Sequence, residues 1–376
     1  MIYNIFQNKK ISALGFGAMR LPVLNGNDGD IDEKSVEKMV GYAMEHGINY
    51  YDTAWGYHRG MSEIVMGKIL GMYPRESYYL ASKFPGYDLS NMNRVEEIFM
   101  RQLEKCSTDH FDFYLFHNVC EMNIEQYLDP GYRIFEYLSE QKKNGRIKHL
   151  GFSAHGDISV IERFLEKYGE YMEFGQIQLN WIDWKFQKAC DKVEIFKKYG
   201  VPVWVMEPLR GGRLASLPER YESELRELRP DESPASWAFR FIQTLPVTVT
   251  LSGMSDFDQL KQNIATYEKS EPLNKKEFDT LIRFAEEMTS VKILPCTGCR
   301  YCVEYCPQGL DIPKLLAAYN EHSFSDGGFI APMYLAALPD DKRPSACISC
   351  GSCKSVCPQQ INIPETLAEF SEKLGI

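Results

Sequence analysis

The sequence lacks the features that direct a chain into a membrane or a secretory pathway. Its first residues, Met1–Phe6, include no cationic segment followed by a long apolar core, and no window approaches 18 uninterrupted apolar residues. Neither a secretory signal peptide nor a membrane-spanning helix is therefore expected. We expect a cytoplasmic protein that has no membrane partner.

An excess of positive charge is also absent. The 376 residues include 42 Lys and Arg against 52 Asp and Glu, which gives a formal net charge of −10 at pH 7. Nucleic acids attract basic surfaces, so a nucleic-acid partner is not expected either. A hydrophobic content of 44% and a charged content of 25% are ordinary for a globular protein. The length allows one large domain and one small one.

No Gly-x-Gly-x-x-Gly motif follows the first expected strand, which argues against a Rossmann domain. Instead, short apolar segments alternate with helical patterns along most of the chain. The expected strands are residues 11–19, 49–53, 78–83, 111–117, 147–152, 176–179, 201–205 and 247–251. Eight such units within roughly 250 residues predict an α/β fold, a closed (β/α)8 or TIM barrel, rather than an open doubly wound sheet.

Cysteine is the residue that the sequence has in unusual number, with 11 in total. Eight of them form two runs with the spacing Cys-x2-Cys-x2-Cys-x3-Cys, and a proline (Pro307 or Pro358) follows each run. The runs are Cys296, Cys299, Cys302 and Cys306, and then Cys347, Cys350, Cys353 and Cys357. This spacing holds [4Fe–4S] clusters in two-cluster bacterial ferredoxins, where the fourth cysteine usually ligates the other cluster. Zinc and disulfides fit less well, because zinc sites use paired Cys-x2-Cys units and disulfides need an oxidising compartment.

The cysteine runs divide the chain into two expected domains. Residues 1–290 would form the barrel, and residues 291–376 would form a small, mainly helical, ferredoxin-like domain with two clusters. The long separation between the runs is more like the cluster-bearing subunits or tails of larger oxidoreductases than a compact bacterial ferredoxin.

Four polar residues follow successive expected strands, at the barrel end where this fold places its chemistry. They are Asp52, Tyr57, Lys83 and His117. The Asp-Thr-Ala-x-x-Tyr run, with the lysine and histidine at the next two strand ends, resembles the catalytic tetrad of the aldo/keto reductase family. The resemblance covers about residues 1–290. It implies that a small carbonyl compound and an alcohol are interconverted by hydride transfer with a nicotinamide cofactor.

The chemistry of that reaction suggests a role for each residue. Hydride addition builds negative charge on the carbonyl oxygen, which requires a nearby proton donor. We expect Tyr57 to be this acid and Lys83, held by Asp52, to lower its pKa. His117 would donate a hydrogen bond to the carbonyl oxygen and orient it.

The resemblance also implies a set of cofactor contacts. Ser153 and Gln176 would bind the nicotinamide carboxamide, although Ala154 stands where the family usually has asparagine. Met206 would replace the aromatic ring on which the nicotinamide usually stacks. The remaining expected contacts, to the pyrophosphate and the adenosine phosphate, are Arg210, Gly211, Gly212, Gly253, Ser255, Gln259 and Asn263.

The loop expected to meet the adenosine phosphate predicts the choice between NAD(H) and NADP(H). Members of the family that prefer NADPH place basic residues there, because a 2′-phosphate binds Arg or Lys. This chain has Asp256 and Asp258 instead. The loop therefore favours NADH.

The two expected domains handle electrons differently, because hydride transfer moves two electrons together and each cluster takes one. A flavin usually joins these steps, and a barrel can bind FMN phosphate without a recognisable motif. The first hypothesis is a reductase whose clusters exchange electrons with a redox protein partner, through a flavin or another mediator. The second is an NAD(P)H carbonyl reductase whose cluster domain is structural or redox-sensing. The third is an electron-carrier or docking protein without carbonyl turnover.

Overall fold

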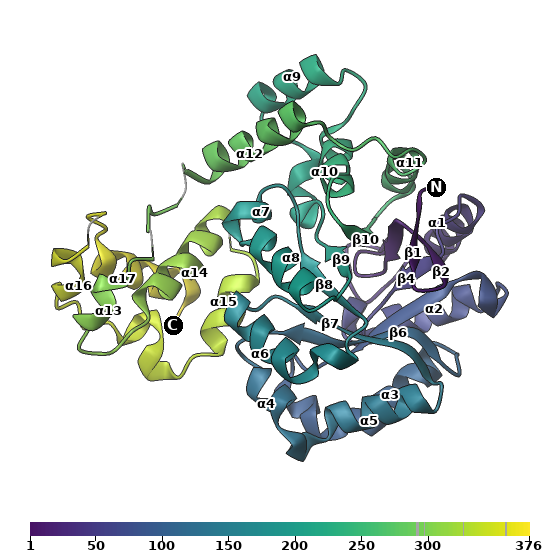
Figure 1. The fold of residues 1–376 in the computed structure, drawn as a ribbon, viewed down its shortest axis with the longest axis horizontal. Coiled ribbons are helices and arrows are strands. Elements are labelled where there is room, and N and C mark those ends of the chain that lie inside the picture. The colour runs from purple at the N-terminus through teal and green to yellow at the C-terminus, as the bar shows by residue number, and fades with distance from the viewer. Residues whose placement is uncertain (291–292, 297, 326, 358) are drawn as a thin grey trace. The chain divides into compact units, whose positions relative to one another are not determined.

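The computed structural model describes residues 1–290, 293–296, 298–325, 327–357 and 359–376. The chain forms two units, Met1–Ile282 and Arg283–Ile376, and the division falls inside helix α12 (Lys275–Ser290). The strands belong to the first unit, and the second is mainly helical (Figure 1). No helix in the described ranges is long and apolar enough to cross a membrane.

Eight parallel strands close into a barrel in the first unit. In order around the barrel they are β3 (Leu14–Gly17), β4 (Tyr50–Asp52), β5 (Tyr79–Phe84), β6 (Phe111–Val119), β7 (Ile147–Ala154), β8 (Phe174–Gln178), β9 (Val203–Met206) and β10 (Val247–Gly253). Strand β10 pairs with both β9 and β3, which closes the ring. The predicted (β/α)8 barrel is confirmed.

Helices in the connections surround this barrel (Figure 1). They are α1 (Glu33–Glu45), α2 (Ser62–Leu70), α3 (Val95–Lys105), α4 (Ile124–Leu128), α5 (Ile134–Lys143), α6 (Ile158–Tyr168), α7 (Asp183–Phe186), α8 (Ala189–Lys198), α9 (Glu219–Leu228), α10 (Pro234–Gln243) and α11 (Phe257–Thr266). Helix α1 illustrates how they form. The Asp32 side chain accepts a hydrogen bond from the Ser35 backbone N–H, and Val36, Val40 and Ala43 are buried on one face.

The expected first strand, residues 11–19, was partly wrong. Residues Tyr3–Phe6 (β1) and Lys9–Ser12 (β2) form an antiparallel hairpin, and the first barrel strand begins only at Leu14. The Phe6 ring packs edge-on against Trp204, with 5.1 Å between ring centres, inside the aromatic core near the strand starts. The hairpin thus covers the amino-terminal end of the barrel. The carboxyl end is left for a functional site.

The second unit is mainly helical, as predicted. Its helices are α13 (Tyr301–Glu304), α14 (Ile312–Ser325), α15 (Ile330–Ala336), α16 (Ser352–Ser355) and α17 (Ile363–Leu374). The two cysteine runs repeat one backbone conformation. Gly298 and Ser349 have φ values of 68° and 55°, and Arg300 and Gly351 have values of 66° and 77°. Matching left-handed positions give both runs the same turn, which presents their cysteines in the same way.

Candidate functional site

The four predicted catalytic residues meet at the carboxyl end of the barrel. The Lys83 Nζ donates hydrogen bonds to Oδ1 of Asp52 at 2.6 Å and to the carbonyl oxygen of Thr53 at 2.8 Å. The same ammonium lies 5.0 Å from the centre of the Tyr57 ring. The Tyr57 and His117 rings are 6.1 Å apart, edge to face. Strand ends that are distant in sequence therefore form one compact group.

A β-bulge in strand β6 determines the orientation of the His117 side chain. The pairing of β6 with β7 shifts register between Phe116 and Val119, and Asn118 adopts a left-handed φ of 58°, which asparagine tolerates better than most residues. The Asn118 backbone N–H donates to Oγ of Ser153 at 2.8 Å. The bulge therefore sets the direction of His117 and ties it to a predicted cofactor residue.

A buried histidine fixes the loop that carries Tyr57. This loop follows β4 and includes the turn η1 (Tyr57–Gly60), in which His58 and Arg59 have left-handed φ values of 51° and 54°. The Nε2 of His58 accepts a hydrogen bond from the Leu21 N–H at 2.9 Å, and Nδ1 lies 2.8 Å from the carbonyl oxygen of Asp28. A single tautomer, with the proton on Nδ1, satisfies both bonds. The tyrosine loop is thus tied to the segment that follows β3.

Burial governs the protonation of the tetrad. Burial raises the pKa of Asp52 and lowers the pKa of Lys83, while the attraction between the two charges opposes both shifts. Burial also lowers the pKa of His117 well below its ordinary value of 6.5. The imidazole is therefore neutral at pH 7, so it can donate one hydrogen bond to a substrate oxygen without carrying charge.

The net shift of the Tyr57 pKa is upward, opposite in direction to the lowering expected from Lys83. Burial raises the pKa of Tyr57 well above 10, and the nearby carboxylates of Asp52 and Glu207 raise it further. The Asp52 carboxylate, at 2.6 Å from Lys83, offsets the charge of the ammonium. Tyr57 therefore holds its proton at neutral pH, which is the form that can protonate a carbonyl oxygen.

The three predicted nicotinamide contacts lie on adjacent strands. Ser153 pairs with Gln176 in the β7–β8 register, and Nε2 of Gln176 lies 3.5 Å from Sδ of Met206 on β9. The Oε1 of Gln176 and the Nδ1 of His117 are buried without a hydrogen-bond partner among the described residues. A buried amide oxygen left unpaired costs about 1–3 kcal/mol, and a carboxamide N–H₂ would satisfy it. This part of the site fits the group predicted for it.

Arg210 does not present its charge at the surface, although the sequence suggested it for the pyrophosphate. Its Nε donates to both carboxylate oxygens of Asp183, at 3.1 and 3.2 Å, and both side chains are buried. Gly211 and Gly212 follow with left-handed φ values of 70° and 95°, which glycine adopts without strain. The Arg210 guanidinium therefore anchors this turn from the inside.

Arg20 is a basic residue at the same end of the barrel that the sequence analysis missed. It is exposed and follows β3, and its stem runs along Gly253, where a Cβ would lie 3.1 Å from the Cβ of Arg20. A Cβ on Gly211 would lie 3.4 Å from Nη2 of Arg20. The Ser255 hydroxyl donates to the Arg20 carbonyl oxygen at 3.0 Å. The guanidinium thus lies between the two loops predicted to bind phosphate.

The other predicted phosphate contacts lie at the start of α11 and hold one another. The Oε1 of Gln259 accepts from the Ser255 N–H at 2.9 Å, and Nε2 of Gln259 donates to Oδ2 of Asp256 at 2.7 Å. The buried Asn263 donates to Oγ of Ser252 at 3.1 Å. These bonds fix the loop and keep the Asp256 carboxylate in it.

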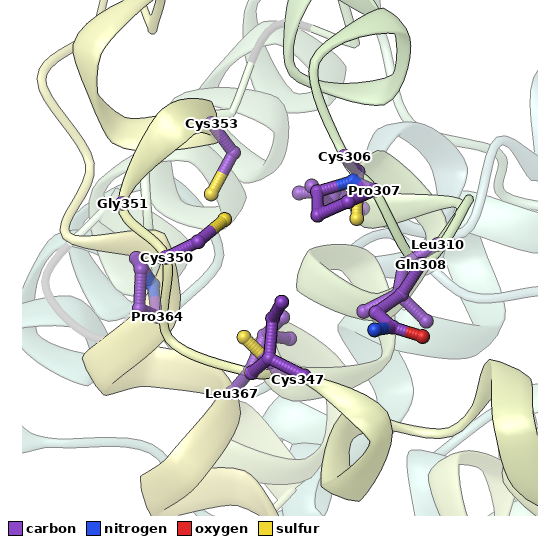
Figure 2. A pocket seen from close by; sticks show the side chains of 12 residues that line it. Cys306, Pro307, Gln308, Leu310, Cys347, Cys350, Gly351, Cys353, Pro364 and Leu367 are labelled. Carbon is purple, nitrogen blue, oxygen red and sulfur yellow. The ribbon is translucent and has the colours of Figure 1, made fainter.

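Eight cysteines surround two cavities in the second unit, each of about 310 Å³ including space open to solvent. One cavity is lined by Cys306, Cys347, Cys350 and Cys353, and the other by Cys296, Cys299, Cys302 and Cys357. Figure 2 shows the labelled cysteines of the first set around a shared space. Each cavity takes three cysteines from one run and the fourth from the other run. This is the crossed arrangement expected from the spacing.

The donor set suits iron–sulfur clusters better than single metal ions. Within the described ranges, no three His, Cys, Asp or Glu side chains are grouped closely enough to hold one ion. Four thiols spread around a cavity match a four-iron cluster, which is wider than an ion and takes one thiolate per iron. Apolar side chains such as Leu310 and Leu316 complete the two walls. Pro358, the proline that follows the second run in the sequence, lies outside the described residues.

His155 should make the stability of the fold decrease at acidic pH. Burial, together with the charge of Lys192, lowers its pKa to about 4 from 6.5. Below pH 6.5 the unfolded chain binds a proton that the folded chain does not, so stability should fall as the pH drops from about 6.5 to about 4, by at most about 1.4 kcal/mol per pH unit. Urea unfolding at pH 7 and pH 5 measures this loss. The loss should be smaller in His155→Asn, and an equal loss in both proteins would contradict the assignment.

Comparisons with known proteins match both units. Residues 13–286 match the aldo/keto reductase family, and residues 295–362 match the 4Fe-4S dicluster domain. The uncharacterized oxidoreductase YrpG of Bacillus subtilis is 23% identical over 303 residues, which cover 69% of this chain and 89% of YrpG. The NADH-specific methylglyoxal reductase of Escherichia coli is 24% identical over 221 residues, 54% of this chain and 65% of that enzyme.

Solved structures resemble the first unit. An aldo-keto reductase from Bacillus halodurans, in its holo form, is 25% identical with a TM-score of 0.61, and the match covers 75% of this chain and 96% of that one. An aldo-keto reductase from Klebsiella pneumoniae in complex with NADPH has a TM-score of 0.59 at 19% identity, over 76% of this chain and 96% of that one.

Proposed function

This chain belongs to the aldo/keto reductase family, and from that premise we propose that it reduces a small carbonyl compound to an alcohol with a nicotinamide cofactor. The observation that carries the proposal is the tetrad, in which the buried Lys83–Asp52 pair lies against the ring of Tyr57, beside His117. The second unit would hold two [4Fe–4S] clusters for one-electron exchange. The enzyme is therefore an iron–sulfur oxidoreductase.

The chain's own residues supply positioning and the proton. A bound nicotinamide supplies the hydride, and Gln176, Ser153 and Met206 would hold it. The neutral His117 would donate a hydrogen bond to the substrate oxygen, and Tyr57 would give its proton to that oxygen as charge develops. The raised pKa keeps Tyr57 protonated at neutral pH, which is the form that carbonyl reduction needs.

We propose NADH as the preferred cofactor, with Arg20 as the cation for its pyrophosphate. Asp256 adds negative charge to the loop expected to meet the adenosine phosphate, and a relative is named as an NADH-specific methylglyoxal reductase; both support this proposal. We expect kcat/KM to be higher with NADH than with NADPH when methylglyoxal or 4-nitrobenzaldehyde is the probe. Arg20→Gln should raise KM for both cofactors by a similar factor, roughly tenfold, because a charge-assisted phosphate contact is worth about 1.5–3 kcal/mol.

Two results would contradict this cofactor assignment. A clear preference for NADPH would reverse the inference drawn from Asp256. An Arg20→Gln variant that loses affinity for NADPH alone would place the arginine at the 2′-phosphate and not at the pyrophosphate.

The clusters pose a separate question, because one hydride carries two electrons. The eight cysteines would hold two clusters, which could take up one electron each when NADH becomes NAD⁺ and one proton, provided that a flavin or another mediator splits the pair. Anaerobic purification with iron, sulfide and flavin analysis, followed by addition of NADH, tests this route. Bleaching of cluster absorbance supports a reductase that passes electrons to a redox protein partner. Flavin-free protein whose clusters NADH cannot reduce, but which turns over carbonyls, supports a structural or redox-sensing cluster domain.

A further inference from the structure

Glu63 is a fully buried carboxylate behind the tetrad, in the first turn of α2. Its Oε1 accepts hydrogen bonds from Oγ of Ser82 and Nε2 of Gln102, both at 2.6 Å, and its Oε2 accepts from Nζ of Lys105 at 2.6 Å. A buried charge of this kind is tolerated only when it is paired and fully hydrogen-bonded. Glu63 meets both conditions.

One side of this network holds the strand that carries Lys83. Ser82 immediately precedes Lys83 on β5, and Nε2 of Gln102 also donates to the Lys83 carbonyl oxygen at 3.0 Å. The Oε1 of Gln102 accepts from the Tyr114 hydroxyl on β6 at 2.5 Å. The backbone of Lys83 is therefore fixed from outside the barrel, while its ammonium faces the site.

The other side of the network reaches the loop that carries Tyr57. The Lys105 ammonium lies 4.6 Å from the centre of the Trp55 ring and 3.5 Å from the Trp55 carbonyl oxygen. It also lies 3.8 Å from the position of a Cβ on Gly60. Trp55 is two residues before Tyr57 and Gly60 is three residues after it, so Lys105 contacts one end of the tyrosine loop and lies near the other.

We propose that the Glu63–Lys105 ion pair is a positioning device that sets Tyr57 against Lys83. Neither residue is a member of the tetrad; each acts through the main chain next to a tetrad residue. This inference rests on the proposed function, because it assigns the pair a role in the same proton transfer. The link between the tyrosine loop and β5 does not depend on the proposed function and can be tested without a substrate.

The test replaces the pair without leaving a buried charge. In Glu63→Gln with Lys105→Met, both charges are absent, so neither partner is left as an unpaired buried charge. We expect kcat for 4-nitrobenzaldehyde reduction to fall 10- to 100-fold, because small misplacements of a catalytic group have such effects. KM for NADH should stay within twofold. Hydrogen exchange should become faster at the amides of residues 54–60.

A matched control pair lies at the other end of the same strands. Arg75 donates to Oδ2 of Asp112 at 2.6 Å, and the Leu80 N–H on β5 donates to the same oxygen at 2.9 Å. Arg75→Met with Asp112→Asn should lower stability but keep kcat and exchange at residues 54–60 near wild type. Lys105→Arg, which retains the charge, should keep kcat within about threefold.

The outcomes distinguish the positioning role of the ion pair from the proposed activity of the enzyme. Wild-type kcat and wild-type exchange in the Glu63/Lys105 double variant would overturn the positioning role. Equal effects in the control pair would reduce that role to general stability. If wild-type protein reduces no aldehyde, the proposed function fails, and the exchange measurement still decides whether the pair holds the tyrosine loop.

Discussion

Replacing Tyr57 by phenylalanine should lower kcat for the reduction of 4-nitrobenzaldehyde by NADH about 10²- to 10⁴-fold, the usual contribution of a general acid. The substitution removes one hydroxyl and leaves the ring that faces His117 and the Lys83 ammonium. Packing of the site should therefore survive. Steady-state kinetics, together with the affinity for NADH measured by fluorescence, checks both parts of this expectation.

Tyr87 offers a matched control for this experiment. Its ring lies 5.2 Å from the His117 ring, and burial raises its pKa to about 12. Tyr87→Phe removes the same atom at the edge of the site, where the Lys83–Asp52 pair is not in contact, so kcat should fall less than tenfold. If Tyr57→Phe retains activity within tenfold of wild type, the tetrad does not act as assigned.

The crossed cysteines predict an unusual pattern of cluster loss. Cys299 lines the cavity of the first run, Cys350 lines that of the second run, and Cys306 faces the second cavity although it belongs to the first run. Cys306→Ala with Cys350→Ala should therefore remove one cluster and about half of the iron. Cys306→Ala with Cys299→Ala should remove both clusters.

Iron and sulfide analysis of protein purified without oxygen, with electron paramagnetic resonance of the reduced state, distinguishes these variants. Ligation within single runs would give the reverse result, because Cys299 and Cys306 would then serve the same cluster. Cys190→Ala is a suitable control, since this cysteine lies in α8, outside both runs, and should leave the iron content unchanged.

Much of the barrel was predictable because its signals are local. The strands of a closed barrel are buried on both faces, so each is a short apolar run, and all eight were found in the sequence. Asp52 and Tyr57 lie within one loop, and Lys83 and His117 lie at the next two strand ends, so their meeting follows from the barrel itself. The crossed cysteines were equally predictable, because their spacing is characteristic of two-cluster ferredoxins.

The remaining features depend on contacts between distant residues. Arg20 lies beside Gly211 and Gly253, and nothing near residue 20 indicates this arrangement. Glu63 and Lys105 are 42 residues apart and resemble ordinary surface charges on amphipathic helices. The direction of the Tyr57 pKa shift depends on how deeply the ring is buried, which spacing does not reveal. The β1–β2 hairpin was missed because its second strand runs almost directly into β3.

Each cavity takes its fourth cysteine from the other run, and this also determines when the clusters could form during synthesis of the chain. The cavity that begins with Cys296 lacks a ligand until Cys357 has been made, and the other cavity needs Cys347, Cys350 and Cys353. Neither cluster can therefore be completed while only the first run has emerged from the ribosome. The barrel residues precede both runs, so the first unit can fold before any iron is inserted. Cluster assembly would then be a late step in the synthesis of the chain.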